Sequence, residues 1–333
     1  MAKFKGKKAK KTINREKVSF KGINSFDNYI VIIGLLLSAV IGYFMRSWPL
    51  RFERLLGYDP YFFLREATYY LLGGLPKIDP MAPTVTRSLI TEDLQGLPIL
   101  TSIISRVTGV DLLQVHMYLP IFIGIIGSIL TYFVVFKAWN NKYLALISSF
   151  FLAIMPAFIY RTAGGGLWKD TLGSFFFILF MLIAIFIIKE KERNKILIYG
   201  VLSLVVLILY ANTFGNFFFV PLIVATYVLF KPFIKETKKE KNIELMDKIL
   251  KDIVMWVLVG ACRISLIYAN FLIPPYKLAS LRVYLALLGI GFASIINFSS
   301  YFAKDRKYYL VFMALLSVVL IAVAQFVLNY NVL

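Results

Sequence analysis

The stretch NYIVIIGLLLSAVIGYFMR, residues 28–46, decides the fold class because it is apolar over almost its whole length. A helix of about 20 apolar residues is long enough to cross the roughly 30 Å hydrocarbon core of a bilayer. The whole chain has 333 residues, of which 59% are hydrophobic and 16% aromatic, a composition too apolar for a water-soluble domain of this size. The sequence therefore predicts an integral membrane protein.

Further apolar runs follow along the chain and predict an all-α membrane fold of about nine transmembrane helices. After the first, the predicted spans cover residues 115–136, 143–160, 171–188, 196–211, 214–230, 253–273, 283–300 and 308–330. The chain has one histidine, His116, and one cysteine, Cys262, which excludes an internal disulfide and a cysteine–histidine metal cluster. We interpret His116, at the end of its span, as an interfacial residue.

The formal net charge of +19 comes from lysines and arginines placed between the apolar runs, so it indicates membrane topology and not nucleic-acid binding. Residues 1–22 hold nine lysines or arginines and one glutamate, and we expect residues 1–27 to form a basic cytoplasmic tail beside anionic lipid. Positive residues in short loops stay cytoplasmic, which predicts a cytoplasmic N-terminus and an outside C-terminus. The predicted inner connections are basic and cover residues 137–142, 189–195, 231–251 and 304–307.

The segment GYDPYFFLREATYYLLGG, residues 57–74, keeps charged residues in the predicted outer connection 47–112. Asp59 before Pro60 predicts the N-cap and the first residue of a short amphipathic helix on the membrane surface, which Gly73 ends. Its predicted apolar stripe contains Leu64, Thr68 and Leu71. Two interpretations of Asp59 remain open: a structural cap, or a carboxylate held for metal binding and acceptor activation.

A second predicted outer connection, residues 160–170, reads YRTAGGGLWKD. Its three glycines, 164–166, allow backbone conformations and close approaches that other residues forbid. Arg161 and Asp170 flank them. The structural alternative is a flexible turn between two helices. Because both predicted connections face the same side, their carboxylates can share one site, and a hard divalent cation requires several such oxygen ligands.

Four motifs occur in an order that resembles one family. They are YDPYFFLREATYYL at 58–71, QGLPILTSI at 95–103, YRTAGGG followed by Asp170, and YANTFGNFFFVPLIVATYVLF at 210–230. Together they resemble the catalytic subunit of oligosaccharyltransferase, the membrane enzyme that moves a glycan from a polyprenyl carrier to asparagine. The resemblance covers residues 28 to about 232, the N-terminal transmembrane region of that family.

The resemblance implies a C-type glycosyltransferase fold and a metal-dependent inverting enzyme that uses Mg²⁺ or Mn²⁺. It implies that Asp59 is catalytic and binds the metal together with Asp170. Residues assigned to the donor phosphate or to site support are Arg65, Arg161 and Arg263, and Glu92 and Asp93 are possible additional acidic residues. Arg263 lies in the middle of the span 253–273, where an arginine is costly and should face a polar group.

Implied partners are the lipid bilayer, a polyprenyl (dolichyl) phosphate-linked or pyrophosphate-linked glycan, a protein acceptor and a partner subunit, with no nucleic acid. The implied location is the cell membrane of an archaeal-like prokaryote.

The sequence also departs from the family pattern. Thr171 and Leu172 follow Asp170, where the family has a second acidic residue or a histidine two positions later. The family's soluble C-terminal domain is not expected in this chain. Two alternatives to a transferase therefore stay open. One is a non-catalytic relative that binds lipid-linked glycan or acts as a membrane subunit. The other is a transporter, which would need a polar pathway through the spans.

Overall fold

A computed structural model describes residues 25–74 and 95–214, together with isolated positions between 220 and 257. Within these residues all regular secondary structure is helical. In chain order the elements are α1 (Ser25–Ser47), the 3-10 helix η1 (Trp48–Phe52), α2 (Asp59–Leu71), α3 (Gly96–Thr108), α4 (Leu112–Trp139), α5 (Lys142–Ile154), α6 (Pro156–Arg161), α7 (Lys169–Lys189) and α8 (Arg193–Thr213). Almost all of the predicted tail 1–27, the connection 231–251 and the last four predicted spans lie outside the described residues.

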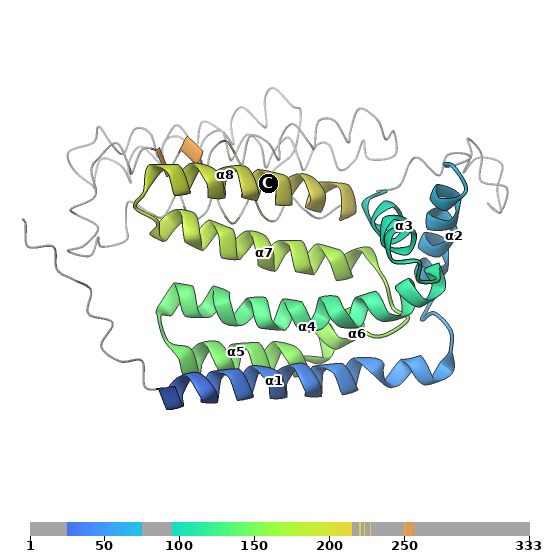
Figure 1. Cartoon of the computed structure of the whole chain (residues 1–333), viewed down its shortest axis with the longest axis horizontal. Coiled ribbons are helices and arrows are strands. Elements are labelled where there is room, and N and C mark those ends of the chain that lie inside the picture. The colour runs from blue at the N-terminus through green and yellow to red at the C-terminus, as the bar shows by residue number, and fades with distance from the viewer. Residues whose placement is uncertain are drawn as a thin grey trace, which may run out of the picture.

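The long helices lie side by side in one bundle (Figure 1). Helix α7 packs against both α4 and α8, while α5 packs against α4 and α1. Four helical segments are long and apolar enough to cross a membrane, namely Asn28–Phe52, Leu112–Trp139, Lys169–Lys189 and Arg193–Thr213. These four helical segments contain the predicted spans 28–46, 115–136, 171–188 and 196–211, and their length and composition agree with that prediction.

Small residues allow α1, α4 and α5 to approach closely, as is usual between membrane helices. The hydroxyl of Ser149 in α5 donates a 2.8 Å hydrogen bond to the carbonyl of Ser128 in α4. A Cβ atom on Gly34 of α1 would lie 2.6 Å from the side chain of Leu146. This tight packing fixes the helices that carry the connections discussed below.

The predicted span 143–160 is wrong as a single helix. Helix α5 ends at Ile154, and Met155 has extended dihedral angles before Pro156 begins the six-residue helix α6. Proline lacks a backbone N–H and disfavours the helical conformation at the residue before it, so the helix stops there. The break leaves the last carbonyls of α5, including that of Ala153, without partners inside the helix.

Helices α2 and α3 pack together at one end of the bundle (Figure 1). Helix α2 begins at Asp59, one residue before the predicted first helical residue Pro60, so Asp59 is not its N-cap. The N-cap is Tyr58, and no side chain caps the helix there. The predicted end is confirmed, because the helix stops at Leu71 and Gly73 has a φ of +118° that favours glycine.

The predicted membrane-surface stripe of α2, with Leu64, Thr68 and Leu71, is not the face that packs against the rest of the protein. The buried residues of α2 are Pro60, Phe63, Glu66 and Ala67. Phe63 belongs to the same hydrophobic cluster as Leu97 of α3 and Leu172 of α7. Helix α2 carries apolar side chains on most of its faces, so its own sequence does not specify which face is buried. Packing against the neighbouring helices decides this.

Candidate functional site at the loop end

The connection between α6 and α7, residues 162–168, packs against the chain that leads into α2. We call α2, α3 and this connection the loop end. The backbone N–H of Leu56 donates a 2.8 Å hydrogen bond to the carbonyl of Gly165. One turn into α2, the ring centroid of Phe63 lies 5.2 Å from the Nζ of Lys169. Asp59 begins α2 and Asp170 follows Lys169, so the two segments that carry the predicted carboxylates pack together.

The three glycines of the connection are buried and closely surrounded. Gly165 has a φ of +77°, and a Cβ atom there would lie 2.9 Å from the carbonyl oxygen of Arg54. A Cβ on Gly164 would lie 2.7 Å from Leu50, and one on Gly166 would lie 2.2 Å from the ring of Trp168. Glycine is therefore required by close contacts, and the alternative of a flexible turn does not describe this connection.

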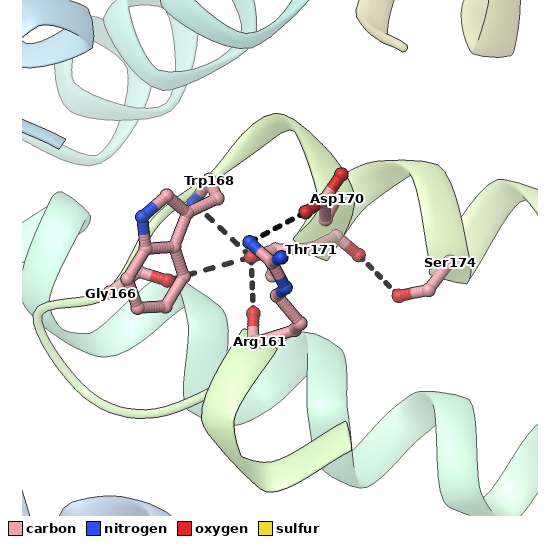
Figure 2. A network of polar contacts seen from close by, with 6 residues as sticks. All are labelled: Arg161, Gly166, Trp168, Asp170, Thr171 and Ser174. Atoms are coloured by element: carbon pink, nitrogen blue, oxygen red, sulfur yellow. Dashed lines mark hydrogen bonds and ion pairs between the residues drawn. The ribbon is translucent and has the colours of Figure 1, made fainter. Parts of the chain in front are cut away.

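Thr171, in the first turn of α7, is the centre of a polar network (Figure 2). Its hydroxyl accepts a 3.2 Å hydrogen bond from the backbone N–H of Trp168 and donates to the carbonyl of Arg161. Trp168 also stacks on Tyr160, with ring centroids 5.3 Å apart. These contacts join the end of α6 to the start of α7 and fix the positions of Arg161 and Asp170.

Arg161 and Asp170 form an ion pair, with Nη1 2.7 Å from Oδ2 (Figure 2). The side chain of Arg161 is 47% exposed and that of Asp170 is 34% exposed. Exposed ion pairs are weak because water screens them. The pair therefore leaves both groups able to exchange partners with a charged ligand.

A second polar group joins α2 to α3. The amide of Gln95 donates a long, 3.5 Å bond to the buried carboxylate of Glu66, and the hydroxyl of Tyr70 donates to the Gln95 carbonyl at 3.1 Å. Burial, with a further contribution from Glu66, raises the pKa of Tyr70. The predicted Arg65 is half-buried, with its guanidinium carbon 5.4 Å from the centroid of the Phe62 ring.

The described residues supply at most part of a divalent cation site. Among them, no three histidine, cysteine, aspartate or glutamate side chains gather closely enough to hold a metal ion. Asp59 and Asp170 contribute two carboxylates, whereas a hard cation such as Mg²⁺ takes about six ligands. The predicted residues Glu92, Asp93 and Arg263 lie outside the described part of the chain.

Two polar residues near this site are buried, which the sequence did not indicate. Arg46, in the last turn of α1, has no exposed surface although it ends an apolar run, where a charged residue normally reaches the interface. His116 is fully buried, and its Nδ1 lies 3.0 Å from the carbonyl oxygen of Leu112. Helices α2 and α3 pack against α4, so that a residue near its start becomes buried.

An apolar groove of about 610 Å³ lies beside the ion pair of Arg161 and Asp170. Aromatic residues of α6, α7 and the end of α8 line it, including Phe158, Phe177 and Phe214. The groove therefore places charged groups next to an apolar surface formed by membrane-length helices.

These features define a multi-pass membrane protein whose polar site is built from two connections at one end of a helical bundle. The model of the family described as oligosaccharyl transferase STT3, N-terminal, matches residues 37–330. This match covers most of the chain, which therefore belongs to that family. No curated protein matches the sequence.

Solved structures of the oligosaccharyltransferase from Archaeoglobus fulgidus have the same fold in the region compared. The apo form has a TM-score of 0.65 and 17% identity over 91% of this chain and 37% of that one. The complex with Zn and sulfate has a TM-score of 0.63 and 18% identity, and covers 89% and 41% of the two chains. The archaeal enzyme AglB from the same organism, with an inhibitory peptide and a dolichol-phosphate, has a TM-score of 0.57 and 18% identity over 88% and 39%. The present chain thus spans about two fifths of these relatives' length.

Proposed function

We propose that this chain acts in oligosaccharyl transfer, moving a glycan from a polyprenyl phosphate or pyrophosphate carrier, such as a dolichyl carrier, to a peptide acceptor. One observation carries the proposal: in a member of the STT3 family, the hydrogen bond from Leu56 to Gly165 holds the segment before Asp59 against the connection before Asp170. The apolar groove beside Arg161 and Asp170 supports a substrate with a lipid part. The related archaeal structures contain an acceptor peptide in one case and dolichol-phosphate in another.

We further propose the C-type glycosyltransferase architecture of about nine spans, with the loop end outside and the N-terminus in the cytoplasm. The opposite end of the bundle supports this orientation. Its turns carry Lys137, Lys142, Lys189 and Lys195, and positive residues in short loops stay on the cytoplasmic side.

In the proposed reaction, the exposed carboxylate of Asp59 accepts a hydrogen bond from the attacking amide nitrogen and orients it. No described residue forms an ion pair with Asp59, so the carboxylate is available to an acceptor. Arg65 and Arg161 neutralise charge on the departing phosphate, as positioned cations do in phosphate-releasing reactions. Arg263 is proposed to hold the same phosphate.

A bound divalent cation, Mg²⁺ or Mn²⁺, would add positive charge at the leaving phosphate. We propose Asp59 and Asp170 as its ligands, with Glu92 and Asp93 as additional acidic candidates. One of the related archaeal structures is a complex with Zn and sulfate, which supports a divalent cation in this fold.

The test is glycan transfer from a purified polyprenyl-linked donor to a peptide in detergent, with Mn²⁺ or with a chelator. We expect Asp59→Asn to lower turnover by about 10²- to 10³-fold, the usual loss when one transition-state contact is removed. Glu53→Gln is the matched control, since Glu53 is an exposed carboxylate in the same connection and has no proposed role. Equal activity in wild type and Asp59→Asn would exclude the proposed role.

The second candidate function is a non-catalytic relative that binds lipid-linked glycan or acts as a membrane subunit. The ion pair of Arg161 and Asp170 favours it, because a cation must displace Arg161 before it can bind the Asp170 carboxylate. Donor binding that survives chelation, without turnover under any metal condition, would support this function over the transferase.

A further inference from the structure

We propose that Arg46 is a positioning residue that ties the connection 162–168 to the end of α1 and so holds the two proposed carboxylates in register. The importance of this tie for glycan transfer rests on the proposed function. Arg46 is fully buried inside a membrane-length segment, where a charged side chain is costly and usually has a specific role. No described carboxylate pairs with it, so its partners are neutral oxygen atoms.

Arg46 binds the connection through both its side chain and its backbone. Its Nε donates a 2.8 Å hydrogen bond to the hydroxyl of Thr162, and its carbonyl accepts a 2.8 Å bond from the N–H of Gly164. Its Nη1 donates to the carbonyl of Ala153 at 2.8 Å and to that of Gly42 at 3.1 Å. One residue thus joins α1, the end of α5 and the connection before α7.

Three neighbouring features accommodate the guanidinium. The break at Pro156 leaves the carbonyl of Ala153 free to accept its hydrogen bond. Gly124 of α4 provides space, because a Cβ atom there would lie 2.3 Å from the Arg46 Nε. The ring centroid of Phe158 lies 5.3 Å from the guanidinium carbon, a favourable distance for a cation and an aromatic face.

The contacts of Arg46 lead directly to the proposed site. Thr162 is adjacent to Arg161, whose side chain pairs with Asp170. Gly164 is adjacent to Gly165, whose carbonyl binds the chain three residues before Asp59. Loss of the Arg46 contacts is therefore expected to loosen both segments together. Lysine cannot replace arginine here, because a single ammonium cannot reproduce the planar fork of donors that reaches Thr162 and Ala153 at once.

The experiment measures how accessible the connection 162–168 is to a reagent in solution, and it requires no glycan. In a Cys262→Ser background, Ala163→Cys places a thiol at a position that is 6% exposed. We measure its reaction rate with a hydrophilic maleimide in detergent. Arg46→Met, Arg46→Lys and Thr162→Val are each expected to raise the rate at least tenfold, and the double variant Arg46→Met/Thr162→Val no further than either single change. Thr162→Ser keeps the hydroxyl and should react at the parental rate.

Two controls separate this role from general destabilisation. Arg51→Met removes an exposed arginine near the same end of α1, 3.9 Å from the Trp48 ring centroid, and should leave the rate unchanged. Ser149→Ala removes a buried hydrogen bond between α4 and α5 and should lower thermal stability without raising the rate. A parental rate in folded Arg46→Met, or an equal rise in Arg51→Met, overturns the proposal.

If Arg46→Met does not fold, the comparison of Thr162→Val with Thr162→Ser decides the question, and equal rates in those two overturn it. Glycan transfer by the same variants is measured separately. A chain that transfers no glycan still gives the labelling result, so failure of the proposed function and failure of the positioning role are distinguishable.

Discussion

Two connections at opposite ends of the bundle join helices in different ways. The turn between α4 and α5 consists of Asn140 and Asn141. Asn140 has a φ of 56°, and its N–H donates to the carbonyl of Phe136 at 2.7 Å. The side chain of Asn141 accepts 3.1 Å hydrogen bonds from the N–H groups of Tyr143 and Leu144. The turn is exposed, and these bonds span at most four residues.

The connection 162–168 instead depends on contacts from distant parts of the chain. Its hydrogen bonds reach Arg46 in α1, Leu56 before α2 and Met117 in α4. Side-chain caps and turn residues act locally and can be recognised in a sequence, whereas contacts of this second kind exist only after the bundle has assembled. The difference predicts that substitutions at the buried connection cost more than those at the exposed turn.

The largest effect is expected at Gly124, which makes room for Arg46. In Gly124→Ala the new methyl group would lie 2.3 Å from the Arg46 Nε and 2.8 Å from the Thr162 hydroxyl. Overpacking of this kind costs about 3 kcal/mol. Gly127→Ala, one turn along α4, meets the tip of the Phe158 ring at 3.2 Å and the side chain of Ile178 at 3.6 Å. It should cost under about 1 kcal/mol, since alanine favours helix. Reversible unfolding in mixed detergent micelles, followed by circular dichroism, gives the free energy of unfolding of both variants. Equal losses of stability would contradict the tight fit around Arg46.

A somewhat smaller loss is expected for Gly165→Ala. Its positive φ strains any L-residue by about 1 to 2 kcal/mol, and the contact with the Arg54 carbonyl should bring the total to about 2 to 3 kcal/mol. Gly109→Ala is the matched control, because Gly109 has a φ of +71° but no atom within 4 Å of the added Cβ. The two variants are compared by how much each lowers the free energy of unfolding relative to wild type. The difference between these two losses measures the contact with the Arg54 carbonyl alone. No difference would mean that the connection can move away from Arg54.

At the exposed turn, Asn141→Ala should lower stability by about 1 kcal/mol, the usual value of a helix N-cap. Asn141→Asp keeps an acceptor for the same two N–H groups and should retain most of the stability. The same unfolding measurement checks both variants. A loss as large as that of Gly165→Ala would show that this turn is not held by local contacts alone.

The smallest effect is expected for Lys189→Met. The Lys189 ammonium donates to the carbonyls of Lys137 and Ala138, next to the turn, with the second bond at 2.7 Å. Because the side chain is exposed, its removal should cost about 0.5 kcal/mol. Lys191→Met removes a neighbouring exposed charge and serves as the control. A loss of stability larger than that of Asn141→Ala would contradict the prediction, because it would show that the Lys189 contacts stabilise the turn more than its own N-cap does.

The candidate site could be predicted only in part. The sequence placed Asp59, Arg65, Arg161 and Asp170 in two connections, and the structure packs those connections together. It did not indicate Arg46 or Thr162, since an arginine that ends an apolar run is normally interfacial and a threonine in a loop has no distinctive pattern. It also did not indicate the buried face of α2 that contains Phe63 and Glu66, because the predicted stripe consists of other residues.

The sequence by itself determined that this protein is a helical membrane protein, because the length of an apolar run must match the thickness of a bilayer whatever its neighbours are. Local sterics also set the end of α2 before Gly73, which the sequence predicts. The break at Pro156 has a local cause as well, but the apolar run 143–160 concealed it and predicted one continuous helix. Only the tertiary structure decided that Arg46 is buried, that the glycines 164–166 are enclosed and that the segments of Asp59 and Asp170 meet. These features depend on hydrogen bonds and close contacts between residues far apart in the chain, and no local pattern specifies them.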